Sequence, residues 1–188
     1  MSFNITKFGA ELSSDGFSNL SHFLIRVGQP KGMLGTRYDI AEWLSYRIKS
    51  ATLPGRSVRA LEYFTYGPEQ KIGGAGSYTD VQMQVICSSR HKERDFFLDW
   101  QDIIIGNHRK QVGYTTTMFD QGYYSNYISR VEIDVFDETG KVTKTVVLEE
   151  AYPNNIGDIQ YDWGTSEHAS FSVSWSYRYF YEKDIIRD

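Results

Sequence analysis

The sequence is poor in the features that mark secreted, membrane-spanning or nucleic-acid-binding proteins. It holds one cysteine, Cys87, so no internal disulfide can form, and we expect a chain made in a reducing compartment, the cytoplasm. No apolar run approaches the length that crosses a bilayer, and no basic-then-apolar leader opens the chain, so we expect no membrane insertion. The net charge is −4, which argues against a surface that binds nucleic acid by neutralising phosphates.

Groups that assemble catalytic or metal sites are also scarce. No two of the four histidines stand at metal-ligand spacing, and Cys87 has no cysteine partner. Asp99 and Asp102 lie three residues apart on a predicted helix, where an acid–base pair is one interpretation and a solvated acidic face the simpler one. The sequence therefore predicts no enzyme, no bound metal and no cofactor. The histidines are His22, His91, His108 and His168.

What the sequence does have is aromatic residues and alternating strands. Aromatic residues make up 15 % of the 188, and this length allows one domain over residues 1–188 with a proper core. Between Ser170 and Tyr181 every second side chain is apolar or aromatic, with serines and Arg178 between them. Because successive side chains on a strand point to opposite faces, this strand has one large apolar face and one small, hydroxylated face.

The remaining pattern predicts several more strands and one helix. Strands are expected at residues 21–27, 57–66, 78–87, 127–136 and 142–149, and a loop or helical turn over 37–49 leads into a strand ending at Leu53. Residues 151–155 should break the strand before them. Ser89 is a good N-cap and Gly106 a natural stop, so a helix of about four turns is expected between them. This order indicates a mainly β fold, an antiparallel sandwich or barrel with one flanking α-helix.

Two segments are predicted to extend from this domain. Residues 67–77 (GPEQKIGGAGS) are rich in glycine and are expected to form the long loop of a hairpin that joins the strands 57–66 and 78–87. They lack the Lys-Ser/Thr pair of a phosphate-binding loop. Residues 1–19 show no period and are expected to form an N-terminal arm. For residues 67–77, contact with another copy and a mobile surface loop both remain open.

Three marks in the chain resemble the tail tube proteins of contractile-tailed bacteriophages. They are Ala51–Gly55, which closes the second strand, Phe97–Gln101 in the helix, and Tyr152–Gly157 followed by Ile159, Asp162 and Trp163. The alternating terminal strand follows them in the same order. The sequence is similar in the same way to the tube proteins of type VI secretion systems and bacteriocins, which share the fold.

The resemblance implies a structural virion protein, made in the host cytoplasm, that forms hexameric rings stacked into the inner tube of a contractile tail. Each subunit would give strands to a ring-wide inner β-barrel, and DNA would pass through it without specific binding. The implied partners are further copies of the chain, the tail sheath protein, the baseplate tube initiator, the tail terminator and the tape-measure protein in the lumen. A baseplate tube initiator, the tube of a phage-derived injection device and, in a different class, a monomeric β-barrel that binds a small apolar ligand remain alternatives.

The same resemblance leads to an assignment of individual side chains. The lumen is expected to be lined by Ser170, Ser172, Ser174, Ser176, Arg178, Gln82 and Gln84. The core is expected to hold Phe97, Trp100, Ile104, Phe171, Val173 and Trp175. Contact between rings is expected from Glu69, Gln70, Lys71, Ile72, Gly73 and Gly74, with residues 1–19 as a further candidate.

Overall fold

The computed structural model describes residues 20–33, 42–64, 66–106, 121–164 and 166–184. The predicted N-terminal arm, residues 1–19, and His108 lie outside them. The helical segments are the 3-10 turn η1 (Lys31–Met33), α2 (Glu42–Ser45), α3 (Lys92–Ile105) and α4 (Tyr124–Tyr127). The strands are β1 (Phe23–Val27), β2 (Ile48–Ala51), β3 (Arg56–Tyr63), β4 (Gln70–Tyr78), β5 (Val81–Ile86), β6 (Ser129–Phe136), β7 (Val142–Ile156), β8 (Ser170–Ser176) and β9 (Tyr179–Asp184).

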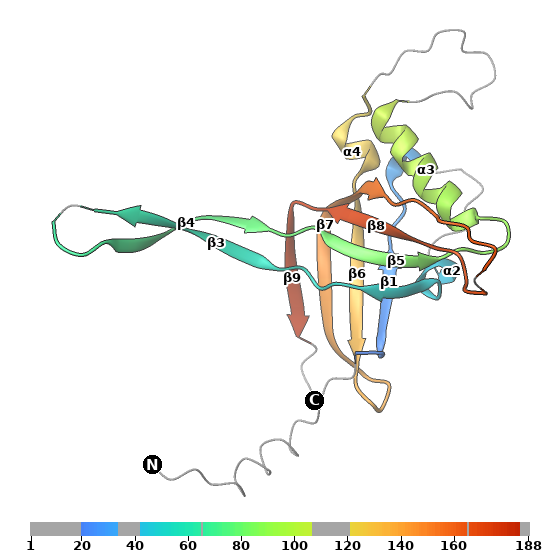
Figure 1. The fold of residues 1–188 in the computed structure, drawn as a ribbon, viewed down its shortest axis with the longest axis horizontal. Helices are drawn as coiled ribbons and strands as arrows, with labels where there is room; N and C mark the ends of the chain where they lie inside the picture. The colour runs from blue at the N-terminus through green and yellow to red at the C-terminus, as the bar shows by residue number, and fades with distance from the viewer. Residues whose placement is uncertain (1–19, 34–41, 65, 107–120, 165, 185–188) are drawn as a thin grey trace, which may run out of the picture.

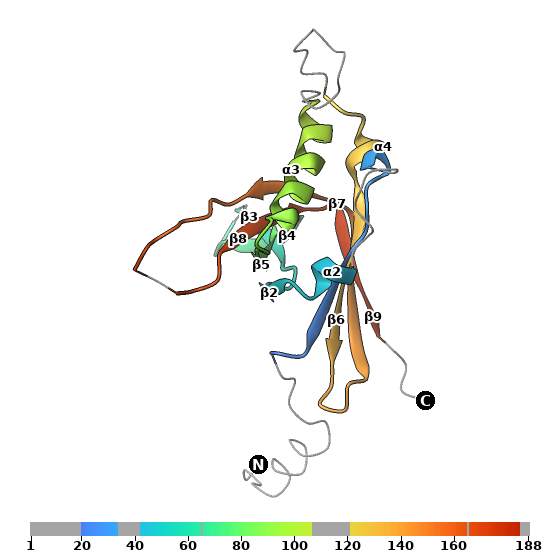
Figure 2. The same ribbon diagram turned by 90° about the vertical axis from the view of Figure 1, so that its right-hand side faces the viewer.

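Seven strands form one antiparallel sheet that turns on itself at the long strand β7. The first half of β7 pairs with β6 and β9, and its second half pairs with β8. We call the part β1-β6-β7-β9 sheet A and the part β7-β8-β5-β2 sheet B. In Figure 1 sheet A runs vertically and sheet B crosses in front of it, and Figure 2 shows the two layers from the side. The predicted mainly β, antiparallel fold is confirmed, although the described strands of one subunit do not close into a barrel.

The turn between the two sheets is centred on Glu150. Its backbone φ is 55°, a left-handed conformation that is uncommon for a residue other than glycine. Its carboxylate accepts hydrogen bonds from the Tyr124 hydroxyl at 2.8 Å and the Arg178 guanidinium at 2.9 Å, and these bonds lower the pKa of Glu150. Burial and the bond to Glu150 raise the pKa of Tyr124 to about 12. The two bonds therefore hold the corner in its strained conformation.

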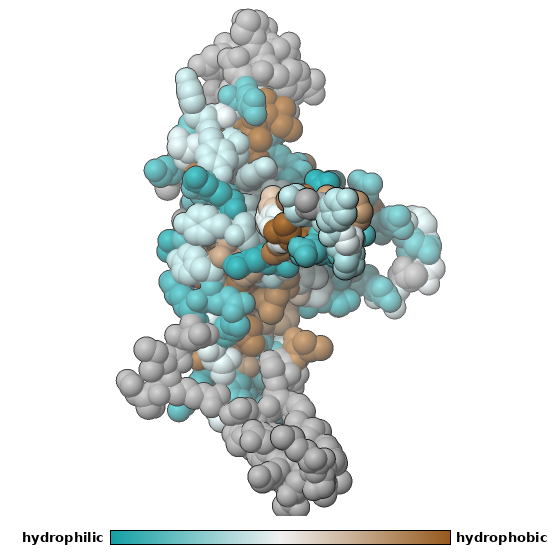
Figure 3. All heavy atoms as spheres, turned by 90° about the vertical axis from the view of Figure 1, so that its left-hand side faces the viewer, coloured by the Kyte–Doolittle hydropathy of each residue, from teal (hydrophilic) through white to brown (hydrophobic). Residues whose placement is uncertain are grey.

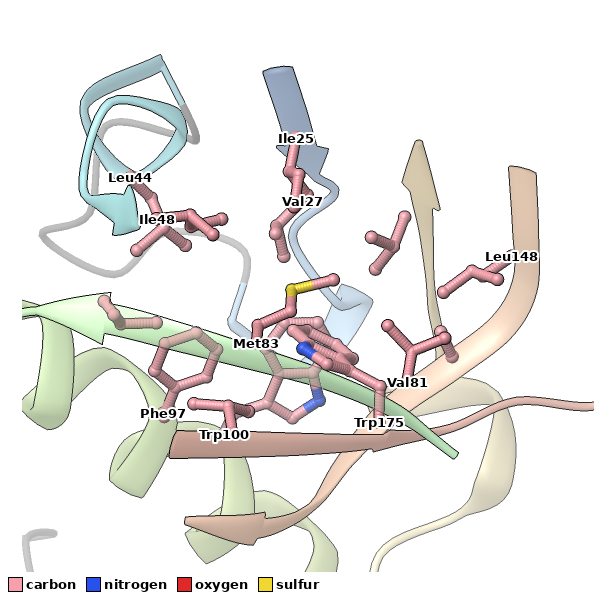
Figure 4. Close-up of a cluster of buried hydrophobic side chains, with 14 of the residues drawn as sticks. Ile25, Val27, Leu44, Ile48, Val81, Met83, Phe97, Trp100, Leu148 and Trp175 are labelled. Atoms are coloured by element: carbon pink, nitrogen blue, oxygen red, sulfur yellow. The ribbon is translucent and has the colours of Figure 1, made fainter. Parts of the chain in front are cut away.

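The core lies between the sheets and beneath α3. Trp100 of α3 meets Trp175 of β8 edge to face, with ring centroids 5.4 Å apart, and both are fully buried. Phe97 contacts Phe171 and Trp175 in the same manner, with centroids 5.9 Å apart in both pairs. Val173 is fully buried, and Ile104 is partly buried against the cluster. Figure 4 shows Phe97, Trp100 and Trp175 with aliphatic side chains from other strands, among them Val27, Val81, Met83 and Leu148.

The predicted helix exists, but it begins later than the sequence suggested. It ends before Gly106, whose φ of 74° suits the predicted glycine stop. The N-cap is His91, with a φ of 50° and no side-chain cap bond, so the prediction of Ser89 was wrong. The reason lies in Glu93, which is 1 % exposed and accepts hydrogen bonds from both the backbone N–H and the hydroxyl of Ser88. These bonds order the chain just before the helix, so the helix starts beyond it.

The last strand is broken where the sequence predicted continuity. β8 ends at Ser176 because the chain changes partner there: β8 pairs with β5 and the second half of β7, whereas β9 pairs with the first half of β7. In the break, the Arg178 N–H donates to the Glu149 carbonyl at 3.1 Å. β7 itself continues through residues 151–155, which were expected to end it, because a bulge after Pro153 keeps the pairing with β8.

The predicted hairpin joined the wrong strands. β3 pairs with β4, so residues 70–77 are strand rather than loop, while β5 belongs to sheet B. Glycine is what permits this pairing. A Cβ on Gly74 would lie 2.9 Å from Cγ of Leu61 and 3.0 Å from the carbonyl oxygen of Arg59. β3 and β4 together form a two-stranded arm, residues 56–64 and 66–78, that projects from the body in Figure 1.

Candidate functional site

One face of sheet B carries the predicted polar side chains next to one another. β5 and β8 place Gln82 opposite Ser174 and Gln84 opposite Ser172. The Gln82 amide donates a hydrogen bond to the Ser174 hydroxyl, and Gln84 Nε2 donates to Ser170 Oγ at 3.2 Å. We call this surface the polar face; it consists of Gln82, Gln84, Ser170, Ser172, Ser174 and Ser176.

The polar face is uncharged along its middle and charged at its two ends. Ser50 of β2 and Asn155 of β7 stand opposite its members and extend it sideways with neutral groups. At the end near the arm, Asp80 accepts a hydrogen bond from the hydroxyl of Ser176 at 3.1 Å. At the other end, Lys49 and Glu167 lie around Ser170. A solute that moves along this face therefore meets hydroxyl and amide groups for most of its length.

The serines of this face differ in their exposure. Ser172 is exposed, whereas Ser174 is 6 % exposed beneath the amide of Gln82. Gly157 crosses directly over Ser172, and its N–H donates to the Ser172 carbonyl at 2.7 Å. A Cβ at Gly157 would lie 2.3 Å from the Ser172 hydroxyl oxygen, so the motif that contains Gly157 needs glycine at this crossing.

Arg178 lies beyond the end of β8 and outside the polar face as defined, and its position in the lumen stays a prediction. It follows the end of β8, and its guanidinium forms an ion pair with Glu150 at 2.9 Å. The pairing raises the pKa of Arg178, chiefly through the hydrogen bond to Glu150. The polar face as defined therefore does not include the positive charge of Arg178.

All described residues of the arm except Gly74 are exposed, including its apolar side chains. Leu61 of β3 stands directly opposite Ile72 of β4, and they are 50 % and 51 % exposed. Tyr63, two residues further on the same face, is 55 % exposed. Figure 3 faces the arm and shows brown, hydrophobic atoms among teal ones there. An isolated two-stranded hairpin is marginal in water, so a partner that covers this face would stabilise the arm.

The residues predicted for contact between rings lie near the outer end of this arm. Glu69 precedes β4, and the rest occupy the first part of that strand. Lys71 stands opposite Glu62, and the two glycines follow Ile72 toward the body. Whether they contact another ring stays a prediction.

The base of the arm is held by a cluster that the sequence did not reveal. The Arg56 guanidinium lies over the rings of Tyr78 and Phe180, at 5.8 Å and 5.4 Å from their centroids. Tyr78 and Phe180 pack edge to face at 5.5 Å, and the Tyr177 hydroxyl donates to the Thr79 carbonyl at 2.7 Å. These residues come from three separate stretches of sequence, and the only signal was the run of aromatic residues after Ser176. The cluster fixes the direction in which the arm leaves the body.

The described residues lack the groupings of a metal centre or a membrane span. Among them, no group of three or more His, Cys, Asp and Glu side chains is placed to hold a metal ion. Burial raises the pKa of the Cys87 thiol, which disfavours the reactive thiolate. No helix in the described part is long and apolar enough to cross a bilayer.

Solved structures with this fold come from contractile injection systems. The sheath–tube complex of the extracellular system PVC in its extended state has a TM-score of 0.63, covering 94 % of this chain and 97 % of that one at 12 % identity. A chain of the anti-feeding prophage baseplate has a TM-score of 0.61, covering 92 % and 99 % at 14 % identity. At these identities the likeness shows the fold alone.

The sequence itself matches the family model described as phage tail tube protein over residues 6–183. The chain therefore belongs to the phage tail tube protein family, a family of structural virion components. It is similar to tail tube protein gp19 of Enterobacteria phage T4, with 23 % identity over 138 residues that cover 72 % of this chain and 80 % of that protein. The corresponding protein of phage T6 is 24 % identical over the same coverage. The resemblance seen in the sequence motifs is confirmed.

Proposed function

We propose that the chain forms the inner tube of a contractile tail by closing into rings that stack, and that the tube conducts DNA. The observation that carries the proposal is sheet B. One of its faces is sealed by the aromatic core, and the other is a wall of uncharged hydroxyl and amide groups. A wall of this kind suits the inside of a conduit better than an outer surface, which is usually rich in charge.

Ring closure would use the edges of sheet B. Among the described residues, β2 pairs only with β5, and the part of β7 from Tyr152 to Ile156 pairs only with β8. Exposed edges of this kind invite pairing with another copy, and a closed ring removes them. The result would be a continuous β-barrel with the polar face inside. Six subunits are proposed because the similar anti-feeding prophage baseplate was symmetrised as a 6-fold assembly.

The chemistry of the polar face supports the passage of a polyanion. Cationic groups would bind successive phosphates and retain DNA, whereas neutral hydroxyl and amide groups offer no such attraction. The same surface would hold a tape-measure protein only weakly before DNA enters. On the opposite side, α3 and sheet A would face the sheath, and the two ends of the tube would meet the baseplate initiator and the tail terminator.

Stacking is proposed to depend on the arm, because its apolar side chains are exposed in the single subunit. Leu61→Lys combined with Ile72→Lys should give folded rings that do not stack, seen by negative-stain electron microscopy of the purified protein. A matched control places two lysines in the exposed β6–β7 turn, at Glu138 and Thr139, and should form tubes of normal length. Long tubes from the arm variant would contradict this role.

Conduction is tested with a single residue of the polar face. Ser172→Lys adds a cation at an exposed position in each subunit, and tails that carry it should assemble normally but eject DNA more slowly. Ser172→Gln is the neutral control and should behave as the wild type. Ejection is measured as the rise in fluorescence of a DNA-binding dye in the medium after the receptor is added. Equal rates for the lysine and glutamine variants would refute a position in the lumen.

A further inference from the structure

The connection between β7 and β8 is much longer than its place in the sheet requires. It joins two neighbouring antiparallel strands, which a turn of about 2–5 residues can connect. Here the chain leaves sheet B after Ile156 and returns only at Ser170. A connection of this length in an otherwise tightly connected fold usually has a function of its own. We call its described residues, 157–164 and 166–169, the long loop.

The long loop extends to the side on which the polar face lies. The core fills the space between the two sheets, so the polar face of sheet B is turned away from sheet A. Figure 2 shows the loop on the left, where it runs beyond sheet B and away from sheet A. Its ends adjoin the polar face, because Gly157 stands over Ser172, and Glu167 lines a pocket together with Ser170. In a ring closed through sheet B, the loop would therefore project into the lumen.

Contacts with the start of α3 hold the first part of the long loop. The Arg94 guanidinium donates a hydrogen bond to the Gly157 carbonyl at 2.9 Å. The Tyr161 hydroxyl lies 3.1 Å from His91 Nε2, and the two rings meet edge to face. The loop is thus anchored at a backbone and at a side-chain position. A segment that is ordered in advance loses less conformational entropy when it binds a partner.

Two aromatic side chains of the long loop are open to solvent. Tyr161 is 72 % exposed, and Trp163 is as exposed as in an extended chain, at 106 %. Tyrosine and tryptophan are the residues most often found as anchors in protein interfaces, because they combine a large apolar area with few rotatable bonds. This pair therefore offers an apolar contact to whatever lies in front of the polar face.

The same loop carries negative charge. Residues 157–169 (GDIQYDWGTSEHA) contain three carboxylates and neither lysine nor arginine. Asp158, Asp162 and Glu167 are all exposed. Lys49 of β2 lines the same pocket as Glu167 and offsets one of these charges. Each subunit of a ring would thus add two exposed aromatic side chains and a net negative charge to one circle around the lumen.

These groups suit a polypeptide better than they suit DNA. A duplex presents a phosphate charge on its outside at every step, and carboxylates repel it. A polypeptide with lysine, arginine and apolar side chains would instead pair with the carboxylates and pack on the aromatic rings. Its cations could also lie over the faces of Trp163 and Tyr161. Charge complementarity therefore favours a cationic, partly apolar polypeptide as the occupant.

We propose that the long loops form a collar around the lumen, and that this collar holds such a polypeptide inside the tube. The proposal rests on the proposed ring closure through sheet B and adds the place where a protein in the lumen is bound. Tyr161 and Trp163 pack on its apolar side chains, and Asp158 and Asp162 pair with its cations. Because the collar recurs in every ring, many weak contacts add up along the tube, and the hold grows with tube length. DNA that follows meets a collar that does not retain it.

The position of the collar is tested with a cysteine in place of Trp163, an exposed side chain whose replacement should leave the fold intact. In tubes, Trp163→Cys should react with N-ethylmaleimide, which can diffuse along the lumen, and lose reaction with a maleimide on a polyethylene glycol too large to enter. In single rings, made by adding Leu61→Lys and Ile72→Lys, it should react with both. The matched control, Thr139→Cys in the exposed β6–β7 turn, should react with both reagents in tubes, and wild-type protein gives the background from Cys87.

Every other result of the labelling overturns the collar. Reaction with both reagents in tubes would place Trp163 on the outer surface, and reaction with neither would place it in a contact between subunits. Either result leaves the proposed tube function standing. Absence of rings and tubes from the wild type would instead refute the proposed function itself.

The occupant is tested in complete tails with photoreactive benzoylphenylalanine in place of Trp163. Before ejection, irradiation should crosslink it to a polypeptide other than this chain, at segments that mass spectrometry shows to contain lysine or arginine beside apolar residues. Asp158→Asn with Asp162→Asn should reduce these crosslinks, and they should be lost after ejection, when the lumen has emptied. The same photoreactive residue at Thr139 should give no crosslink that disappears on ejection. Crosslinks to DNA, to the sheath or to another copy of this chain would overturn the proposal, as would crosslinks that persist after ejection.

Discussion

Replacement of Phe171 by alanine tests which face of sheet B is turned toward the core. Phe171 is 2 % exposed, between Phe97 at 5.9 Å and the Arg94 guanidinium at 5.9 Å. Ser172, the next residue, points to the opposite face and is exposed. The two positions therefore form a matched pair with one buried and one open side chain.

The expected loss is worked from these contacts. Burial of a phenylalanine side chain contributes about 1.5–3 kcal/mol to the free energy of unfolding. The edge-to-face pair with Phe97 adds about 0.5–1.5 kcal/mol. The cavity left between α3 and sheet B adds a further cost, so the total loss for Phe171→Ala should be about 3–5 kcal/mol. Ser172→Ala should change the free energy by less than about 0.5 kcal/mol.

Urea unfolding followed by tryptophan fluorescence measures both values, because Trp100 and Trp175 are buried beside the substituted ring. The measurement is made in the arm variant, Leu61→Lys with Ile72→Lys, so that tube formation does not contribute to the apparent stability. A loss below about 1 kcal/mol for Phe171→Ala would mean that the faces of β8 are reversed. A large loss for the serine variant would lead to the same conclusion.

Further predictions concern the corner and the glycines. The lowered pKa of Glu150 means that its carboxylate stabilises the fold above about pH 4.3 and that this contribution is lost as the pH falls through the lowered value. The urea midpoint of the wild type should therefore fall more steeply on acidification than that of Glu150→Gln, and parallel curves would exclude the effect. Gly74→Ala should shorten tubes in electron micrographs, because its Cβ would lie 3.0 Å from a carbonyl of β3, whereas Gly73→Ala, with a contact at 3.8 Å, should not. Gly157→Ala should lower the melting temperature through a loss of about 1–3 kcal/mol, since its Cβ would meet the Ser172 hydroxyl; an unchanged melting temperature would contradict the close crossing.

Structural features that depend on neighbours in sequence could be predicted from the sequence alone. The alternation around Phe171 and Trp175 predicted the strand, and the helical spacing of Phe97 and Trp100 predicted α3. Both signals arise because one buried face imposes its own period on the sequence. The polar side chains of β5 could be placed next to the serines for the same reason, since Gln82 alternates with buried residues.

Structural features that depend on contacts with distant segments could not be predicted from the sequence. The break after Ser176 leaves the alternation intact, because the residues on both sides still pair, only with different halves of β7. The glycine-rich strand looked like a loop, since its stability comes from close approach to β3 and not from its own propensity. The burial of Glu93 could not be predicted either, because only the fold brings Arg47, from a distant segment, to 3.8 Å from its carboxylate. Local rules failed in each case because a long-range contact determined the outcome.

The continuity of β7 determines which parts of the subunit can unfold separately. The single strand β7 forms backbone hydrogen bonds with β6, β9 and β8. Neither sheet can therefore unfold without breaking backbone hydrogen bonds of a strand that also belongs to the other sheet. Amide protons of β7 that are hydrogen-bonded within the sheet should therefore exchange with solvent at one common, slow rate set by global unfolding, while those of the arm exchange much faster in the single subunit. In hydrogen-exchange terms the body is one cooperative unit, and the arm is a separate one that gains protection only when it is covered.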